Sequence, residues 1–241
     1  MGLLSAKGPL IEHSAPKPYR KTPSKPSIYP GACCNRLCTV ARLFIQATSK
    51  PLSLLNTHLD NVSDAQRRYG ASLLLIRGRF EAAISKGPVM LTGDFNSSPT
   101  GSDSGAYEIV TGKVPPVPVD KTFADQYSPR EGAFPDFKFL DTRTETPRFG
   151  VSGNFGTFTG WSPIVTKEWE RIDFIFGGNN RGWCVVCFFY FRKEHCERSP
   201  LLISRFPPRC RTSTACRVGA GMSDDGMMNS DHRPVFNDLT N

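Results

Sequence analysis

Short runs of apolar and β-branched residues predict four strands in this chain. Two of them, residues 38–48 (CTVARLFIQAT) and 52–59 (LSLLNTHL), are separated by the polar residues 49–51, which predicts a hairpin. Residues 171–176 (RIDFIF) alternate between polar and apolar positions, as in a strand with one buried face. Residues 88–92 (PVMLT) are largely apolar, which is typical of a strand inside a sheet.

After the hairpin, apolar residues recur every three or four positions, which predicts a helix over residues 63–86. Ser63 suits the N-cap, and Gly87 followed by Pro88 ends the helix. The apolar stripe consists of Ala71, Leu74, Leu75, Ile76, Phe80 and Ile84. A second helix is expected over residues 102–112. The order of strands and helices predicts an α/β (α+β) architecture with mixed sheets.

The remaining segments lack a usable period. Residues 1–30 are rich in Pro, Lys and Ser and are expected to form a tail or loop. A Pro-rich linker over residues 114–119 is followed by a polar region of loops and short strands at residues 123–160. Residues 181–220 crowd Cys, Arg, Phe and Pro together, and residues 230–236 (SDHRPVF) predict a loop that enters a strand.

A chain of 241 residues is long enough for one substantial domain. No apolar run reaches the roughly 18–20 residues that cross a bilayer. Lys7 and Pro9 interrupt the N-terminal segment, so no signal peptide is expected. We therefore expect a soluble monomer with no transmembrane segment, and the sequence leaves its compartment open.

The net charge of +8 is distributed unevenly along the chain. Residues 1–50 carry +7 and residues 181–220 carry +6, which leaves −5 for the rest. An acidic body suits a site that gathers carboxylates around a divalent cation. It argues against a broad surface that follows the phosphates of a nucleic acid.

The eight cysteines lie in the same two basic regions, and none lies between residues 39 and 183. The pattern Cys184-x-x-Cys187 followed by His195-Cys196 permits a zinc-binding interaction module in residues 184–216. No second clean pair follows it, and the cysteines do not identify a redox compartment.

Four short islands carry the residue types that catalysis requires. They are Asn56-Thr57-His58-Leu59-Asp60, Gly93-Asp94-Phe95-Asn96, Arg171-Ile172-Asp173 and Ser230-Asp231-His232-Arg233-Pro234-Val235. Each lies within or next to a predicted strand, where side chains can converge above a sheet edge. Together they offer the Asp, Asn and His groups that hold Mg²⁺ and move a proton. Taken singly, each also has a structural explanation, such as a turn.

In this order, the four islands resemble the endonuclease/exonuclease/phosphatase superfamily of deoxyribonuclease-I-like proteins. Asp64-Ala-Gln-Arg-Arg68 and Gly156-Thr-Phe-Thr-Gly-Trp161 resemble its members too. The resemblance covers roughly residues 22–180 and 217–241. It implies a four-layer sandwich of two packed mixed β-sheets flanked by helices.

The resemblance also implies how the phosphate and the attacking water are held. Asp94 would orient or deprotonate the water, and Asn96 would hydrogen-bond the phosphate or that water. His58 would contact a non-bridging phosphate oxygen as charge builds in the transition state.

Asp173 would orient the imidazole of His232, and Asp231 would bind the metal. The implied enzyme is a phosphoric ester hydrolase that uses Mg²⁺ or Mn²⁺, in which water attacks a phosphate mono- or diester in line. A nucleic acid, a nucleotide and a phospholipid head group all remain open as the phosphate-ester substrate.

Two features depart from the family pattern. Members usually carry an early strand ending in Asn and a later strand leading to Gln-Glu, whose Glu is the principal metal ligand, and this chain shows neither motif. We therefore expect residues 22–241 to be a partial, N-terminally truncated domain with N-terminal strands missing, after a disordered or non-native tail over residues 1–21. Residues 181–216 are expected to be a non-family insertion, either translated intron or a variable surface loop.

Two functions follow from this pattern. The first is a metal-dependent phosphoesterase whose activity is reduced because a metal ligand is lost. The alternative is a catalytically dead relative that binds a phosphorylated ligand or a protein. The acid–base set favours the enzyme, because binding alone does not require it: Asp94, Asn96, Asp173, Asp231 and His232.

Overall fold

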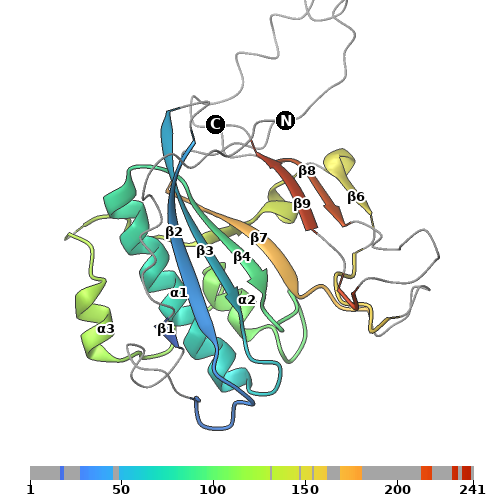
Figure 1. The fold of residues 1–241 in the computed structure, drawn as a ribbon, viewed down its shortest axis with the longest axis horizontal. Coiled ribbons are helices and arrows are strands. Elements are labelled where there is room, and N and C mark those ends of the chain that lie inside the picture. The colour runs from blue at the N-terminus through green and yellow to red at the C-terminus, as the bar shows by residue number, and fades with distance from the viewer. Residues whose placement is uncertain are drawn as a thin grey trace, which may run out of the picture.

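A mixed sheet forms the centre of the protein in the computed structural model (Figure 1). The structure describes residues 17–18, 28–45, 49–130, 132–146, 148–153, 155–161, 169–180, 213–218, 230–232 and 235–239. In spatial order the strands are β1 (Lys17–Pro18), β2 (Leu37–Ile45), β3 (Lys50–His58), β4 (Val89–Asp94), β7 (Asp173–Gly178) and β5 (Phe139–Asp141). Strands β3 and β4 are parallel, and the other neighbours are antiparallel. All four predicted strands are therefore present.

Helix α1 (Asp64–Ser85) connects the parallel strands β3 and β4 and lies against one face of the sheet (Figure 1). It begins as predicted, because the Ser63 hydroxyl accepts a hydrogen bond from the backbone N–H of Gln66. Helix α2 (Gly105–Val110) packs beside α1 and is shorter than the predicted helix. Three shorter elements are α3 (Lys121–Gln126), α4 (Thr142–Glu145) and the 3₁₀ turn η1 (Arg148–Gly150).

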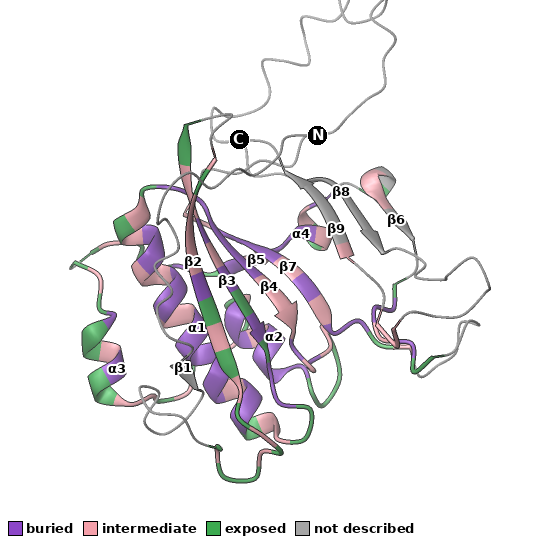
Figure 2. Ribbon diagram, viewed as in Figure 1, coloured by how far each residue is buried: buried purple, intermediate pink, exposed green. Residues whose placement is uncertain are grey.

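The core lies between this helical layer and the sheet, where buried residues gather on the facing sides (Figure 2). The predicted apolar stripe is only partly correct, because Ile84 is 44% exposed whereas Gly78 and Glu81 are buried. Gly78 lies against the buried ring of Phe139, and a Cβ atom there would come within 2.5 Å of that ring. Close packing of the helix on the sheet therefore requires glycine at position 78.

Glu81 is fully buried and joins α1 to the first two long strands. Its carboxylate accepts hydrogen bonds from Arg42 of β2, at 2.9 and 3.1 Å, and from Arg77, at 2.9 and 2.7 Å. The Ser53 hydroxyl of β3 donates to the same group at 3.2 Å. Burial opposes ionisation, but these partners keep the pKa of Glu81 below its usual value.

A second, three-stranded sheet consists of β6 (Val151–Gly153), β8 (Ser213–Val218) and β9 (Val235–Leu239). Strand β9 contacts β7 of the main sheet. The four-layer sandwich that the resemblance implies is therefore seen only in part. Within the described residues, the second sheet has only three short strands, which are too few to cover the six-stranded sheet. Cys184, Cys187 and Cys196 of the possible zinc module lie outside the described residues, as does most of the expected insertion. Residues 213–216, at the end of that insertion, belong to β8.

The open face of the main sheet, opposite α1, is divided in two. One half carries apolar side chains that pack together: Leu52, Leu54, Met90, Leu140 and Ile175. The other half carries the polar residues at the ends of β3 and β4. Among the described helices, none combines the length and apolar character that a membrane span requires.

We predict that Glu81→Ala lowers the free energy of unfolding by about 3–5 kcal/mol, because it leaves Arg42 and Arg77 without their buried counter-charge. Denaturant titration measures this loss. Asp125→Ala is the control, since the Lys121–Asp125 pair is exposed and contributes less than about 1 kcal/mol. Equal effects of the two substitutions would contradict the prediction.

Candidate active site

Three neighbouring strands place one polar residue each in a single row across the open face. His58 of β3 is the Cα partner of Asp94 on β4, and Asp94 is the Cα partner of Asp173 on β7. Paired residues on adjacent strands have side chains on the same face within contact distance. Register alone therefore brings together residues that lie more than a hundred positions apart in the sequence.

Gly93 allows β3 and β4 to approach closely just before Asp94. Its φ is +138°, and a Cβ atom there would lie 1.8 Å from the carbonyl oxygen of Thr57. No other residue fits that space and that backbone conformation. Close pairing of β3 and β4 therefore requires glycine at position 93. This pairing fixes the position of the Asp94 carboxylate.

His232 completes the group from the C-terminal part of the chain. Its Nδ1 lies 2.8 Å from Oδ2 of Asp173, and its Nε2 lies 3.8 Å from Oδ2 of Asp94. The Nε2 atom of His58 lies 3.3 Å from the same Asp94 oxygen. Asp94 is thus approached by two imidazoles, one of which also contacts the second carboxylate.

These contacts shift the pKa values of the residues in this group. Burial alone would lower the pKa of His232, but the hydrogen bond with Asp173 and the negative charges around it raise that pKa above its usual value. Burial and the charge of Asp173 raise the pKa of Asp94. Burial lowers the pKa of His58, and Arg36 and His232 add to that effect. The pKa of the His232 imidazole is therefore raised and that of His58 is lowered, and perturbed pKa values of this kind are typical of active sites.

The segment from Thr157 to Thr159 forms hydrogen bonds both to the start of β7, next to Asp173, and to the residue before His232. The Thr157 hydroxyl accepts hydrogen bonds from the backbone N–H groups of Ile172 and Asp173, both at 3.0 Å. Thr159 donates to the carbonyl oxygen of Asp231 through its backbone N–H at 2.8 Å and its hydroxyl at 3.1 Å. This segment therefore links the start of β7 to the loop that carries His232.

Phe158 and a buried ion pair also help to hold the site residues in place. The ring of Phe158 packs against the imidazole of His232, with centroids 5.2 Å apart. On the helical side of the sheet, Arg171 forms two hydrogen bonds with Asp141, at 2.7 and 2.6 Å. Both partners are buried, so the start of β7 is anchored on both faces.

The other two candidate residues lie at the edge of the group. The backbone N–H of Asn96 donates to Asp94 at 2.8 Å, and its side-chain NH₂ donates to the carbonyl oxygen of Leu59 at 3.0 Å. One N–H of that amide is thus used to hold two loops together. Asp231 precedes His232, but its carboxylate does not belong to the group of described residues whose ligand atoms converge: Asp94, Asp173 and His232, all within 4.8 Å of one another.

The fold is shared with several solved structures. An endonuclease/exonuclease/phosphatase from Bacteroides vulgatus is 24% identical, with a TM-score of 0.63, over 95% of this chain and 65% of that one. A conserved protein of unknown function from Enterococcus faecalis V583 is 20% identical, with a TM-score of 0.62, over 95% and 66%. A mannosyl-6-phosphatase from Bacteroides thetaiotaomicron is 18% identical, with a TM-score of 0.61, over 95% and 65%.

The chain has the endonuclease/exonuclease/phosphatase fold. The predicted resemblance to this family is thereby confirmed at the level of the fold. No family model and no curated protein matches the chain. The chain spans about 65% of the length of these structures, and identities of this size establish the fold and leave the chemistry to the site itself.

A second group of potential metal ligands in this endonuclease/exonuclease/phosphatase fold consists of Cys33, Cys34 and Asp60. It does not suit a cation. The Asp60 carboxylate already accepts backbone N–H groups from Val62, Ser63 and Cys33, which lower its pKa to about 2 although burial opposes this. The Arg36 guanidinium also lies 3.6 Å from it. The group is an anchored loop with its counter-charge already present.

The sequence shows the four candidate islands but not the parts that align them. Thr157 and Thr159 lie in the Gly-Thr-Phe-Thr-Gly-Trp motif, to which the sequence alone assigns no role. Alternating threonines suggest a strand with one polar face, and nothing in that pattern shows which backbone groups they bind. The partners of Thr157 and Thr159 lie 13 to 72 residues away in the chain.

We predict that Asp173→Asn lowers the pKa of His232. The raised pKa depends on a hydrogen bond to a negative charge, and asparagine removes that charge whereas burial, which favours the neutral imidazole, remains. NMR titration of the imidazole protons measures the shift. Asp125→Asn, an exposed change on α3, is the control and should leave the titration unaltered. An unchanged pKa in Asp173→Asn would contradict the observed pairing.

Thr157→Val should lower the free energy of unfolding by about 1–3 kcal/mol, because two backbone N–H groups lose their buried acceptor. It should also lower the pKa of His232, since Asp173 is no longer held in place. Thr157→Ser keeps the hydroxyl and is the matched control for both measurements. If valine and serine behaved alike, the hydroxyl would have no positioning role.

Proposed function

We propose that this protein is a divalent-metal-dependent phosphoesterase that hydrolyses a phosphate mono- or diester. The observation that carries the proposal is His232, held between the carboxylates of Asp173 and Asp94 with His58 on the same Asp94 oxygen. A structural role for one histidine does not require two carboxylates and a second imidazole. The shared endonuclease/exonuclease/phosphatase fold supports the same proposal.

In the proposed reaction, a water molecule attacks phosphorus while the ester oxygen leaves on the opposite side. A new P–O bond forms to the water oxygen, the bond to the ester oxygen breaks, and the leaving alkoxide takes a proton from solvent to become the alcohol. Asp94 or His232 accepts the proton of the water, since both groups share one side of the site. Asp173 keeps His232 in the orientation that the transfer requires, and His58 donates a hydrogen bond to a phosphate oxygen.

The residues present fit a divalent cation. Mg²⁺ prefers oxygen ligands, and Asp94 and Asp173 offer carboxylate oxygens within 4.8 Å of each other. Asp231 precedes His232, and its carboxylate, which lies outside this group, would have to turn toward it to act as a further ligand. When bound, the cation would neutralise charge on the phosphate and stabilise the leaving oxygen. Mn²⁺ fits the same oxygen ligands.

We also propose that a second sheet packs against the first, as in the two-sheet sandwich that the resemblance implies. The apolar half of the open face, around Met90, suits a packed sheet rather than solvent. A covered apolar half would limit access to the polar half, where His58 and Asp94 lie.

The decisive experiment compares the full chain with Asp94→Ala on p-nitrophenyl phosphate and bis(p-nitrophenyl) phosphate in Mg²⁺. Loss of a general base is expected to reduce kcat by about 10²- to 10⁴-fold, and a chelator should abolish the activity of the unaltered chain. Asp125→Ala is the control for a surface carboxylate.

Equal rates for the chain and Asp94→Ala would contradict the enzyme and favour the non-catalytic alternative. In that case a phosphorylated ligand should still bind, and calorimetry with a phosphate ester would detect it. The measurement thus separates the two functions that the sequence left open.

A further inference from the structure

A pocket of about 200 Å³ lies beside the candidate site, at the edge formed by β2 and β3. His58 is one of its lining residues and also contacts Asp94. A phosphate held next to His58 therefore has its ester group within reach of this pocket. None of the residues assigned to the reaction, apart from His58, lines it.

The register of the sheet builds one wall of the pocket. Thr39 of β2 is the Cα partner of Asn56 on β3, and Asn56 is the partner of Thr92 on β4. Asn56 lies two positions before His58, so both side chains point to the same face. The Thr92 hydroxyl donates to the Asn56 amide oxygen at 2.9 Å, which orients the amide and leaves its NH₂ as the donating end.

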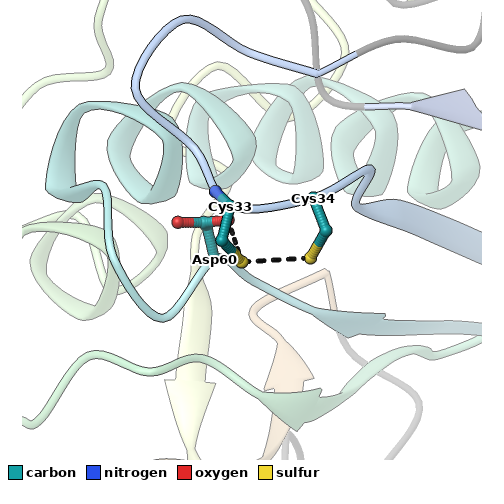
Figure 3. A group of neighbouring side chains, drawn as sticks. All are labelled: Cys33, Cys34 and Asp60. Carbon is teal, nitrogen blue, oxygen red and sulfur yellow. Dashed lines mark hydrogen bonds between the residues drawn. The ribbon is translucent and has the colours of Figure 1, made fainter.

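An anchored loop holds Arg36 beside the pocket. Figure 3 shows Cys33 against Asp60, whose carboxylate accepts the Cys33 backbone N–H at 3.1 Å and its thiol at 3.3 Å. Arg36 follows in the same loop and donates to the side-chain oxygen of Asn61 at 3.0 Å. The Arg36 side chain is only 11% exposed and its guanidinium lies 3.6 Å from Asp60, so the loop fixes this lining residue with its charge already balanced.

The chemistry of the lining selects among ligands. Besides His58, the polar lining residues of the pocket are Asn35, Arg36, Thr39, Asn56 and Thr57. The described lining residues include no carboxylate and no phenyl or indole ring. A cationic head group would thus lack a counter-charge or an aromatic cage in this pocket.

The size of the pocket limits the ligand further. Sites for drug-sized molecules have volumes of about 300–1,000 Å³. A pocket of about 200 Å³ takes one small group, such as a single ring with its hydroxyls. Hydroxyl groups both donate and accept, so they can pair with the asparagine amides and the threonine hydroxyl together.

We propose that this pocket binds the alcohol portion of the substrate, and that this alcohol is a hydroxyl-rich group the size of one sugar ring. The inference rests on the proposed function, because it takes the phosphate to lie at His58. Asn56 and Thr39 are then specificity-determining residues, and the substrates are sugar or polyol phosphates.

The test uses the full chain in Mg²⁺ with three hexose 6-phosphates (glucose, mannose and galactose), p-nitrophenyl phosphate and a single-stranded oligodeoxynucleotide. Asn56→Ala and Thr39→Val should each lower kcat/KM for the best hexose phosphate by about 5- to 10-fold, the size of one lost hydrogen bond, through KM. Activity on p-nitrophenyl phosphate should stay within about two-fold, because its alcohol offers no hydroxyls to the pocket. Thr122→Val, an exposed change on α3, is the matched control.

Equal losses on the hexose phosphate and on p-nitrophenyl phosphate would overturn the proposal, since they indicate a structural role. Preference of the unaltered chain for the oligonucleotide would overturn it as well. If no ester is hydrolysed, the proposed function fails by itself, and calorimetric titration of the hexose phosphates decides the pocket. Binding that Asn56→Ala weakens about 5- to 10-fold supports the pocket, and no binding, or binding that Asn56→Ala leaves unchanged, refutes it.

Discussion

The alignment of three strands is the constraint on which the rest of the site depends. Because β3, β4 and β7 pair in a single register, His58, Asp94 and Asp173 form one row across the sheet. A slip of one residue between β3 and β4 would turn the side chains of one strand to the other face. The core prevents such a slip, since it would bring Leu55 or Leu91 out of the apolar interior.

Two other parts of the chain convert this row into a site with defined electrostatics. The Thr157–Thr159 segment bonds to the start of β7 and to the loop before His232, so the carboxylate and the imidazole are positioned by one element. The two carboxylates then raise the pKa of His232, whereas burial and neighbouring positive charge lower that of His58. Two histidines in one site thereby acquire opposite tendencies, as separate proton donors and acceptors require.

The open face of the sheet separates two tasks. Apolar residues around Met90 occupy one half of this face. The other half carries polar residues of neighbouring strands, among them Thr39, Asn56, His58 and Asp94. The polar half contains both the candidate catalytic group and the proposed alcohol pocket, which share His58. Chemistry and specificity would then depend on adjacent rows of one sheet, so a change of substrate needs substitutions only at the pocket row.

Local sequence patterns determined the elements and the candidate residues. Alternation and apolar runs located β2, β3, β4 and β7, and the Ser63 cap located the start of α1, because these features depend on near neighbours in the chain. The islands around His58, Asp94, Asp173 and His232 were visible for the same reason. The buried face of α1 was not, since Glu81 is stabilised there by Arg42, 39 residues away.

Only the tertiary structure decided which of these residues meet. The sequence contains no sign that Thr157 binds the backbone at Asp173, that Asn56 faces Thr39, or that Asp231 stands outside the converging ligand group. Those relations follow from strand register and from loops that return across long separations, and a linear pattern carries no information on either. The types of residue are a property of the chain, and their distances are a property of the fold.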